Sequence, residues 1–473
     1  MLELTSSIGR RSLTNAIDKQ DHVTEIVPLS ERRSALTLGL LWITMVTGFP
    51  TVLIGFEWYK AGLTLTQVIQ CIAISCCLLL CYAIPSTLLG ARSGQTYSLL
   101  SRRIFGRWGS RLVSANLVWV SIAWYGLTAN FLADGLKGIY HMNVSTVWLG
   151  IAFAFLMAFN NFFGFSGIAN FARYVAGPIL IAWVGFTFFK ASAACSSAVF
   201  VAPVHHPFSA ALMLVSAFII GYAVWGNEAD YWRYGKPKTI LSVIPLVAAL
   251  LVGQVIFPIT GWMMAYISGI TETGAATNLM NQYAFGGFSF IAAAVLVVAY
   301  FAVNDSGLYG AINGIENLKP IARKKVVAGL AIAGAIAAIA LNFVPNAFEL
   351  VATTSSIFLP GATVIMLMEY FWFSRKDKTE FESVPSFAEL PAVKWPAVIA
   401  LLSGLAVGLA TSGLIPGLSF LHVGICSLQG WFASIVVYSA LRAVLRPEIS
   451  TQRTLLEKLL QNDGLGASPV VAE

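Results

Sequence analysis

The sequence predicts an all-α polytopic membrane protein with twelve transmembrane helices. Of its 473 residues, 57% are hydrophobic and only 11% are charged, whereas about a quarter of the residues in an average soluble domain are charged. Apolar runs of about 20 residues, long enough to cross a bilayer, recur along the chain. Lys and Arg gather in alternate short segments between these runs. Together these observations exclude an ordinary soluble enzyme.

The expected spans lie between the residues that interrupt the apolar runs. With the N-terminus inside, only Lys60, Lys137 and Lys190 of the 29 Lys and Arg residues fall on the outer side. The positive-inside rule therefore predicts an even number of spans, both termini in the cytoplasm and a place in the plasma (inner) membrane. The spans are about 36–57, 66–90, 112–136, 145–164, 168–190, 208–232, 239–268, 287–315, 324–343, 346–373, 395–414 and 418–442, between cytoplasmic tails at 1–33 and 443–473.

Other features that often carry chemistry are weak in this chain. The net charge of +7 does not indicate nucleic-acid binding, because the charges sit in loops as topology signals. Cys71, Cys76, Cys77 and Cys81 crowd one apolar run and lack the spacing of metal ligands. There is no P-loop. We therefore expect no cofactor, no metal site and no catalytic residues.

Two of the expected spans are interrupted at mid-depth. The first contains Thr47-Gly48-Phe49-Pro50, and the sixth contains Gly221-Tyr222 and then Trp225-Gly226-Asn227-Glu228. Broken helices in lipid are tolerated where they line a cavity, so they often mark a binding site. Because the two spans are five apart, the pattern predicts a 5+5 inverted repeat (about 36–190 and 208–373) followed by two extra helices (about 395–442). The alternative is that Gly and Pro only kink these helices.

The third span carries aromatic and hydroxyl side chains deep in the membrane. Ser121, Trp124 and Tyr125 are three or four residues apart, so they can share one helix face. Trp124 is far from the interfacial belt where most membrane Trp residues lie. An indole beside a hydroxyl suits the stacking of a flat heteroaromatic ligand. Plain packing is the alternative.

Several ionisable residues also fall within or at the ends of spans. Asp305 lies in the eighth span and should face the interior, with Asn304 or Ser306 near it. Asp230 and Arg233, at the end of the sixth span, are three apart and could form a structural or gating ion pair on one helix face.

Several motifs recur in the same order as in a known family. They are Gly90-Ala-Arg92-Ser-Gly94, Trp124-Tyr125-Gly126, Asp230-Tyr-Trp-Arg233-Tyr234-Gly235, Asn304-Asp305-Ser-Gly-Leu308-Tyr309, and Pro360-Gly361 with Glu369-Tyr370. Together they resemble the nucleobase:cation symporter-1 family, and most of all its bacterial cytosine and purine permease branch.

The resemblance implies a fold of the leucine-transporter type and secondary active import by alternating access. The substrate would be a small neutral nitrogen heterocycle, such as cytosine, a purine, or a hydantoin- or allantoin-like ring, held between Trp124 and either Tyr222 or Trp225. The expected substrate-binding residues are Gly48, Phe49, Ser121, Trp124, Tyr125, Gly221, Tyr222, Trp225, Asn227 and Asn304, and the expected coupling or gating residues are Glu228, Asp230, Arg233 and Asp305.

The sequence departs from the family pattern where sodium-coupled members have hydroxyl side chains in the eighth span. Those positions are Ala302 and Val303 here. A hard cation needs oxygen ligands, so we expect protons rather than Na⁺ as the coupling ion, with Asp305 or Glu228 as the carrier. The alternatives are an amino-acid or osmolyte carrier on the same fold, a channel, and a membrane-embedded enzyme.

Overall fold

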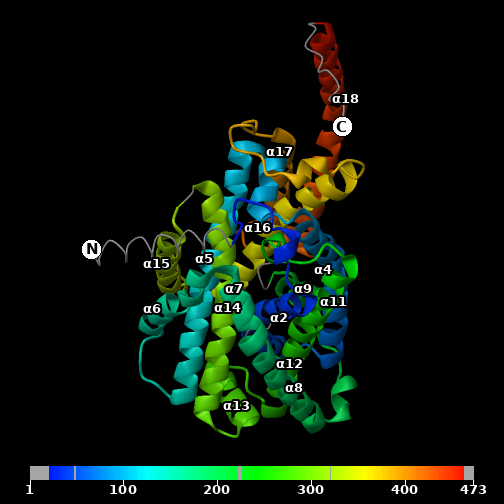
Figure 1. Ribbon diagram of the computed structural model, residues 1–473. Coiled ribbons are helices and arrows are strands. Elements are labelled where there is room, and N and C mark those ends of the chain that lie inside the picture. Colours follow the sequence, from blue (N-terminus) through cyan, green and yellow to red (C-terminus); the bar gives the residue numbers. More distant parts are fainter. Residues whose placement is uncertain (1–20, 47–48, 222–225, 320, 463–473) are drawn as a thin grey trace, which may run out of the picture.

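The structure is a computed structural model that describes residues 21–46, 49–221, 226–319 and 321–462. Over these ranges the chain is helical and forms no strand (Figure 1). In the same ranges, seven helical segments are long and apolar enough to cross a membrane, and one bent pair of helices makes an eighth. Two further apolar helices, Phe208–Ile220 and Trp395–Thr411, are shorter. The predicted polytopic all-α class is confirmed.

The first five predicted spans all have helical counterparts. They are α2 (Ala35–Val46) with α3 (Phe49–Lys60), α4 (Leu65–Ser93), α5 (Tyr97–Tyr140), α6 (Thr146–Leu156), and α7 (Gly164–Phe171) with α8 (Gly177–Ala194). A capping box of Thr64 and Gln67 begins α4, and Gly94 in the left-handed conformation ends it. The π-helical turn η3 (Ala172–Ala176) joins α7 to α8.

The next five spans and the two extra helices follow. They are α9 (Phe208–Gly221) with α10 (Ala229–Trp232), α11 (Thr239–Leu250) with η5 (Leu251–Ile256) and α12 (Phe257–Ser268), α14 (Ser289–Leu318), α15 (Arg323–Leu341), α16 (Ala347–Leu367) with η6 (Met368–Phe373), α17 (Trp395–Thr411) and α18 (Cys426–Asn462). An additional helix, α13 (Thr273–Phe285), occupies a segment where no helix was predicted.

Both predicted interruptions fall between helices. Helices α2 and α3 meet at an angle of 45° around residues 47 and 48, which lie outside the described residues. Helix α9 ends at Gly221, and the chain is described again from Gly226, three residues before α10 begins. The Gly- and Pro-containing segments therefore coincide with the ends of helices.

Helix α5 lies inside the bundle, where it packs against α14, α15, α6 and α16. Figure 1 shows α5 and α14 side by side over most of their length. Gly106 bends α5 near its start, with φ 78° and ψ −175°. The long part of α5 after this bend carries the side chains expected to form the site.

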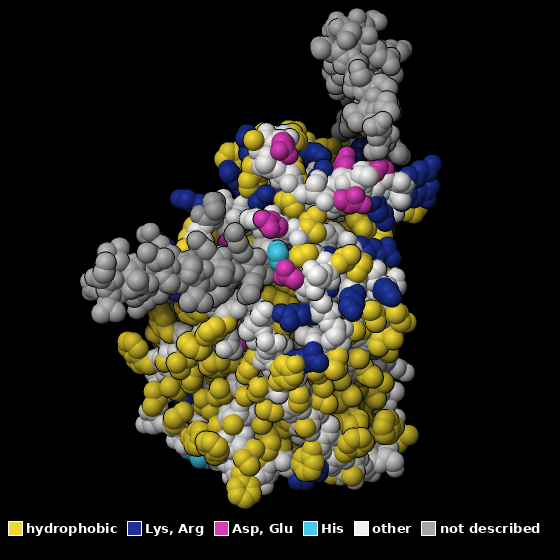
Figure 2. All heavy atoms as spheres, in the orientation of Figure 1, with side chains coloured by type: hydrophobic (Ala, Val, Ile, Leu, Met, Phe, Trp, Pro, Cys, Tyr) yellow, Lys and Arg dark blue, Asp and Glu magenta, His cyan; other side chains and the backbone are white. Residues whose placement is uncertain are grey.

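The surface divides into an apolar zone and a charged zone. Figure 2 shows hydrophobic side chains over the lower part of the molecule and most Lys and Arg side chains around its upper part, the end where α17 lies. Large apolar residues are widely exposed, among them Trp148, Phe189, Phe290 and Ile336. Such a belt is expected of a protein surrounded by lipid.

Candidate functional site

Trp124 lies inside the bundle at the contact between α5 and α16. Its side chain is 5% exposed, and its indole Nε1 donates a hydrogen bond of 2.7 Å to Oγ of Ser355. Ser355 in turn donates to the backbone oxygen of Val351, one helical turn earlier. The ring also meets Phe348 edge to face, with the two centroids 5.9 Å apart. Helix α16 therefore fixes the orientation of the indole.

Ser121 and Tyr125 differ in what their hydroxyl groups do. Ser121 is buried, and its Oγ has no hydrogen-bond partner among the described residues. Tyr125 donates a hydrogen bond of 2.6 Å to the backbone oxygen of Ala154 in α6, and its ring packs against Gly334 of α15. Ser121 thus has a hydroxyl available for a ligand, whereas Tyr125 joins three helices.

Asn304 and Asp305 are both buried on α14. Oδ1 of Asn304 accepts a hydrogen bond from Thr128, and its Nδ2 lies 3.0 Å from Sδ of Met157. Oδ2 of Asp305 accepts a 2.7 Å hydrogen bond from Asn160 in the short helix η2 (Phe159–Phe163). Oδ1 of Asp305 has no partner in the described part of the chain. Asp305 faces the interior as predicted, but its partner is Asn160 rather than Asn304 or Ser306.

Glu228 follows directly on the interruption of the sixth span and is fully buried. One carboxylate oxygen accepts hydrogen bonds from Tyr82 (3.0 Å) and Ser86 (2.6 Å) of α4. The other oxygen accepts the backbone N–H of Gly226 at 3.1 Å. The backbone oxygen of Gly226 accepts a hydrogen bond from Thr363 of α16. The opened backbone is thus held from both α4 and α16, and Glu228 has no Lys or Arg side chain as a partner among the described residues.

The neighbouring Asn227 and Asp230 bind each other. Nδ2 of Asn227 donates to Oδ2 of Asp230 at 3.2 Å, while Oδ1 of Asn227 has no partner among the described side and main chains. Oδ1 of Asp230 accepts the backbone N–H of Tyr97 at 3.0 Å, at the start of α5. The carboxylate of Asp230 therefore caps the N-terminal end of another helix.

The predicted ion pair between Asp230 and Arg233 is wrong. The guanidinium of Arg233 instead donates to the backbone oxygens of Asp21 (2.6 Å) and His22 (2.5 Å) and to the hydroxyl of Tyr309 (2.7 Å). Its hydrogen bond to Asp230 runs from Nε to the backbone oxygen at 3.2 Å, and the carboxylate of Asp230 is not within ion-pair distance of the guanidinium. The helical spacing suggested a pair, but the folded N-terminal segment supplies nearer acceptors.

A cluster that the sequence did not predict fastens the start of the described chain to the bundle. The Asp21 carboxylate forms an ion pair with Arg323, at the start of α15, and accepts the backbone N–H of Phe165 at 2.9 Å. Both charged side chains are nine-tenths buried or more. We call Asp21, Arg233, Tyr309 and Arg323 the tail clamp.

Gly164 makes room for the tail clamp. Its φ is +70°, and a Cβ at this position would lie 2.6 Å from the Asp21 carboxylate. Nearby, Arg32 donates hydrogen bonds to the backbone oxygens of Ala91 and Gly235. Burial and the positive charge of Arg233 lower the pKa of Arg32 to about 10, so Arg32 stays charged at neutral pH. Residues 21–33 therefore pack on the bundle instead of extending from it as a tail.

The other predicted site residues lie partly outside the described chain. Gly48, Tyr222 and Trp225 are not among the described residues, and nothing is described of the Phe49 side chain or the surroundings of Gly221. Ala302 is buried on α14, and its backbone oxygen accepts a 3.2 Å hydrogen bond from Ser306.

These features define the class of the protein as a polytopic membrane transporter. The described chain combines many apolar helices, two interrupted spans, a buried indole, an unpartnered hydroxyl and two buried carboxylates. Residues 26–432 match the family described as permeases for cytosine and purines, uracil, thiamine and allantoin. The chain belongs to this permease family, as its motifs predicted, and permeases are transporters rather than enzymes.

Similar proteins support the same fold. The cytosine permease of Escherichia coli strain K12 is 24% identical over 398 residues, which are 82% of this chain and 89% of the relative. Mhp1, a nucleobase-cation-symport-1 family transporter solved in a closed conformation with bromovinylhydantoin bound, superposes with a TM-score of 0.71 at 18% identity, covering 90% of this chain and 95% of Mhp1. A Na⁺-coupled sialic acid symporter gives a TM-score of 0.62 at 14% identity, covering 88% and 90% of the two chains. The leucine-transporter-type fold is thereby confirmed.

Proposed function

We propose that this permease is a symporter that imports a nucleobase or a related nitrogen heterocycle by alternating access. The observation that carries the proposal is the buried Trp124 with the unpartnered Ser121 one turn away on the same helix. An indole suits stacking with a flat ring, which is worth about 1–3 kcal/mol for a nucleic-acid base. The serine hydroxyl can donate or accept at the edge of such a ring.

The polar groups near the break in the sixth span support a neutral ligand. Oδ1 of Asn227 is buried without a partner among the described residues and can accept an N–H group. The neighbouring carboxylate of Glu228 is already bonded to Tyr82, Ser86 and Gly226. A ring with both N–H and C=O groups would match this set without bringing an unpaired charge into the membrane.

Uptake measurements test the substrate class directly. The chain is produced in cells that lack their own nucleobase uptake, and accumulation of labelled cytosine, adenine, hypoxanthine, hydantoin and allantoin is measured. Unlabelled amino acids and betaine serve as competitors. Saturable uptake of at least one heterocycle, unaffected by the amino acids, is expected. Uptake of an amino acid with none of the heterocycles would instead support the osmolyte or amino-acid carrier.

We propose protons as the coupling ion, carried by Glu228 or Asp305. Both are fully buried, and neither forms an ion pair with a Lys, Arg or His of the described chain. A lone buried carboxylate is costly in its charged form, so binding a proton relieves that cost. Proteoliposomes with an imposed pH gradient should accumulate substrate without Na⁺. Accumulation that needs a Na⁺ gradient and ignores the pH gradient would reject this coupling.

We further propose that both termini face the cytoplasm across the plasma (inner) membrane. The side of the molecule rich in Lys and Arg in Figure 2 would then be the cytoplasmic side. Fusions to the C-terminus test this orientation. Green fluorescent protein should fluoresce there and alkaline phosphatase should be inactive, and the reverse result would place the terminus outside.

A further inference from the structure

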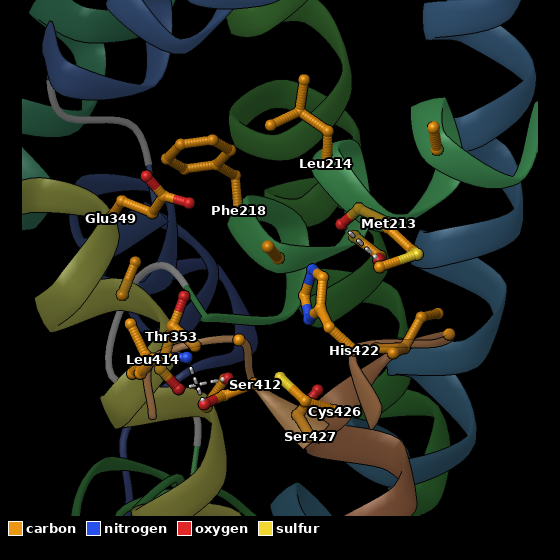
Figure 3. Close-up of a pocket in the computed structure, with 18 of the residues that line it drawn as sticks. Met213, Leu214, Phe218, Glu349, Thr353, Ser412, Leu414, His422, Cys426 and Ser427 are labelled. Carbon is orange, nitrogen blue, oxygen red and sulfur yellow. Dashed lines mark hydrogen bonds between the residues drawn. The ribbon is translucent and has the colours of Figure 1, made fainter. Parts of the chain in front are cut away.

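A cavity separate from Trp124 lies between α9, α16 and the segment that joins α17 to α18. Its volume is about 490 Å³, within the range of small-molecule sites. We call it the side pocket. Figure 3 shows side chains from all three parts pointing into the same space. Its lining includes Met213, Leu214 and Phe218 from α9, Glu349, Thr353 and Ser356 from α16, and Ser412, His422, Cys426 and Ser427.

Two hydroxyl groups that line the side pocket have no hydrogen-bond partner in the described chain. Thr353 is 7% exposed and Ser427 is 2% exposed, yet neither hydroxyl makes a hydrogen bond within the described chain. The hydroxyls of Ser356 and Ser412, in contrast, donate to the backbone oxygens of Thr353 and Leu409. A hydroxyl that opens into a cavity can bond water when the cavity is empty, and a bound molecule can take the place of that water. Thr353 and Ser427 are therefore suited to hold a ligand.

The remaining walls favour a flat molecule with N–H groups. The ring of Phe218 offers an aromatic face, with Leu214 beside it (Figure 3). Glu349 is exposed and can accept N–H groups. His422 is bound through Nδ1 to the backbone oxygen of Thr411 at 3.0 Å, which leaves its Nε2 for a ligand.

Two aromatic rings and one helix connect the side pocket with Trp124. Phe218 lies against Phe348, with centroids 5.2 Å apart, and Phe348 meets Trp124 at 5.9 Å. Helix α16 also serves both places, because Ser355 binds the Trp124 indole while Thr353 and Ser356 line the side pocket. A ligand in the side pocket would therefore contact the helix that orients the indole.

We propose that the side pocket is a second binding site for a flat, neutral heterocycle with N–H groups. The ring lies against Phe218, its N–H groups face Glu349, and its edge bonds Thr353 and Ser427. The ligand class is taken from the proposed function, so the inference rests on it, but the site is separate from the one at Trp124. Since α16 forms part of both, a ligand here changes the affinity at Trp124.

Binding stoichiometry on the purified full-length protein tests the side pocket. The ligand is the heterocycle that gives the highest uptake, and titration calorimetry counts its sites. The wild type should bind two molecules, and Trp124→Ala should keep one. The double variant Thr353→Val with Ser427→Ala should keep the site at Trp124. Its affinity for the ligand in the side pocket should fall at least tenfold. Thr353→Ser retains the hydroxyl and should bind two, as should Trp148→Ala, because Trp148 is exposed on α6 and lines neither site.

The outcomes separate the two proposals. A single site in the wild type that Trp124→Ala removes and the double variant leaves intact would overturn the side pocket and leave the proposed function standing. No binding of any heterocycle by correctly folded wild type would overturn the proposed function and this inference with it. Equal thermal unfolding midpoints of wild type and variants establish that the comparison is between folded proteins. If the double variant fails to fold, Ser427→Ala alone is titrated. The proposal then requires that this variant lose binding in the side pocket.

Discussion

At the scale of single residues, the hydrogen-bond partners of each side chain show which interface it serves. Trp124 and Tyr125 are adjacent in sequence, yet the first is fixed by Ser355 of α16 and the second by Ala154 of α6. The two neighbours therefore serve different interfaces of the same helix. Both lie about one helical turn from the unpartnered hydroxyl of Ser121, but the Tyr125 hydroxyl is already bonded to Ala154.

Replacing Trp124 by Ala should abolish or strongly reduce uptake at low substrate concentration, because the stacking surface for the ring is lost. Removing about 1–3 kcal/mol of stacking weakens binding by roughly 5- to 150-fold. Initial uptake rates at low substrate concentration measure the effect, with expression compared on immunoblots. Trp148→Ala is the matched control, because Trp148 is 70% exposed on α6. Normal uptake by a well-expressed Trp124→Ala variant would remove the stacking model.

Replacing Glu228 by Gln should separate binding from coupling. Gln keeps the size of the side chain and can still accept from Tyr82 and Ser86, but it cannot carry a proton. Proteoliposomes should lose accumulation driven by a pH gradient and retain exchange of labelled for unlabelled substrate. Glu382→Gln, on an exposed part of the chain, should accumulate normally. Unchanged accumulation by Glu228→Gln would assign the proton to Asp305, for which Asp305→Asn is the corresponding variant.

At the scale of elements, the segment before α17 holds the bend in α5. The backbone N–H groups of Arg107 and Trp108 donate to Pro391 and Ala392 at 2.9 Å, and Lys394 donates to Phe105 at 3.0 Å. These bonds satisfy backbone groups that the bend removes from the helix. A Cβ on Gly106 would lie 2.8 Å from the backbone oxygen of Pro391. The hydrogen bonds at the bend thus connect the central helix α5 to the segment before α17, the first of the two extra helices.

Gly106→Ala should destabilise the protein. An L-residue at φ 78° and ψ −175° costs about 1–3 kcal/mol, and the added Cβ collides with the backbone at Pro391. The thermal unfolding midpoint in detergent should fall by several degrees. Gly329→Ala on α15 is the matched control, because its Cβ would meet no atom within 4 Å, and a Gly-to-Ala change inside a helix is favourable by about 0.5–1 kcal/mol. An equal midpoint for the two variants would show that the bend is not needed.

Local signals allowed the spans and their interruptions to be predicted. A run of apolar residues long enough for a bilayer is visible without any knowledge of its neighbours. Gly48 with Pro50, and Gly226 with Asn227, mark the places where helices end because their backbone effects are local. The interior position of Asp305 also followed from a local argument, the cost of exposing a carboxylate to lipid.

Contacts between distant segments could not be predicted in the same way. Ser355 lies 231 residues from Trp124, and no pattern near either residue indicates their hydrogen bond. The spacing of Asp230 and Arg233 indicated an ion pair, but spacing does not reveal the backbone oxygens of Asp21 and His22 that bind Arg233 instead. The polar composition of the N-terminal segment likewise concealed that residues 21–33 are packed.

At the scale of the whole molecule, the tail clamp ties four parts of the chain together at one end of the bundle. Asp21 contacts Arg323 at the start of α15 and Phe165 in α7, and Arg233 joins the end of the sixth span to the same segment. Alternating access requires parts of the bundle to move relative to one another. If the proposed alternating access applies, the tail clamp has to open whenever that end of the transporter opens.

Asp21→Asn should weaken the tail clamp. It leaves the buried guanidinium of Arg323 without its counter-charge, and breaking a buried pair from one side costs about 3–5 kcal/mol. The thermal midpoint should fall, and a reporter cysteine at Ser166, beside the clamp, should react faster with a soluble maleimide. Glu25→Gln is the control, because the Glu25 side chain is 77% exposed. Unchanged labelling in Asp21→Asn would show that the clamp does not close this end.

The tail clamp also sets an order of events during synthesis. Asp21 and Arg323 are 302 residues apart, so at about 5–20 residues per second the first leaves the ribosome roughly 15–60 s before the second. The helices between these two residues are made during that interval. The N-terminal segment cannot take its final position until α15 has been synthesised. The tail clamp at this end of the bundle therefore forms only after the ninth span has been made.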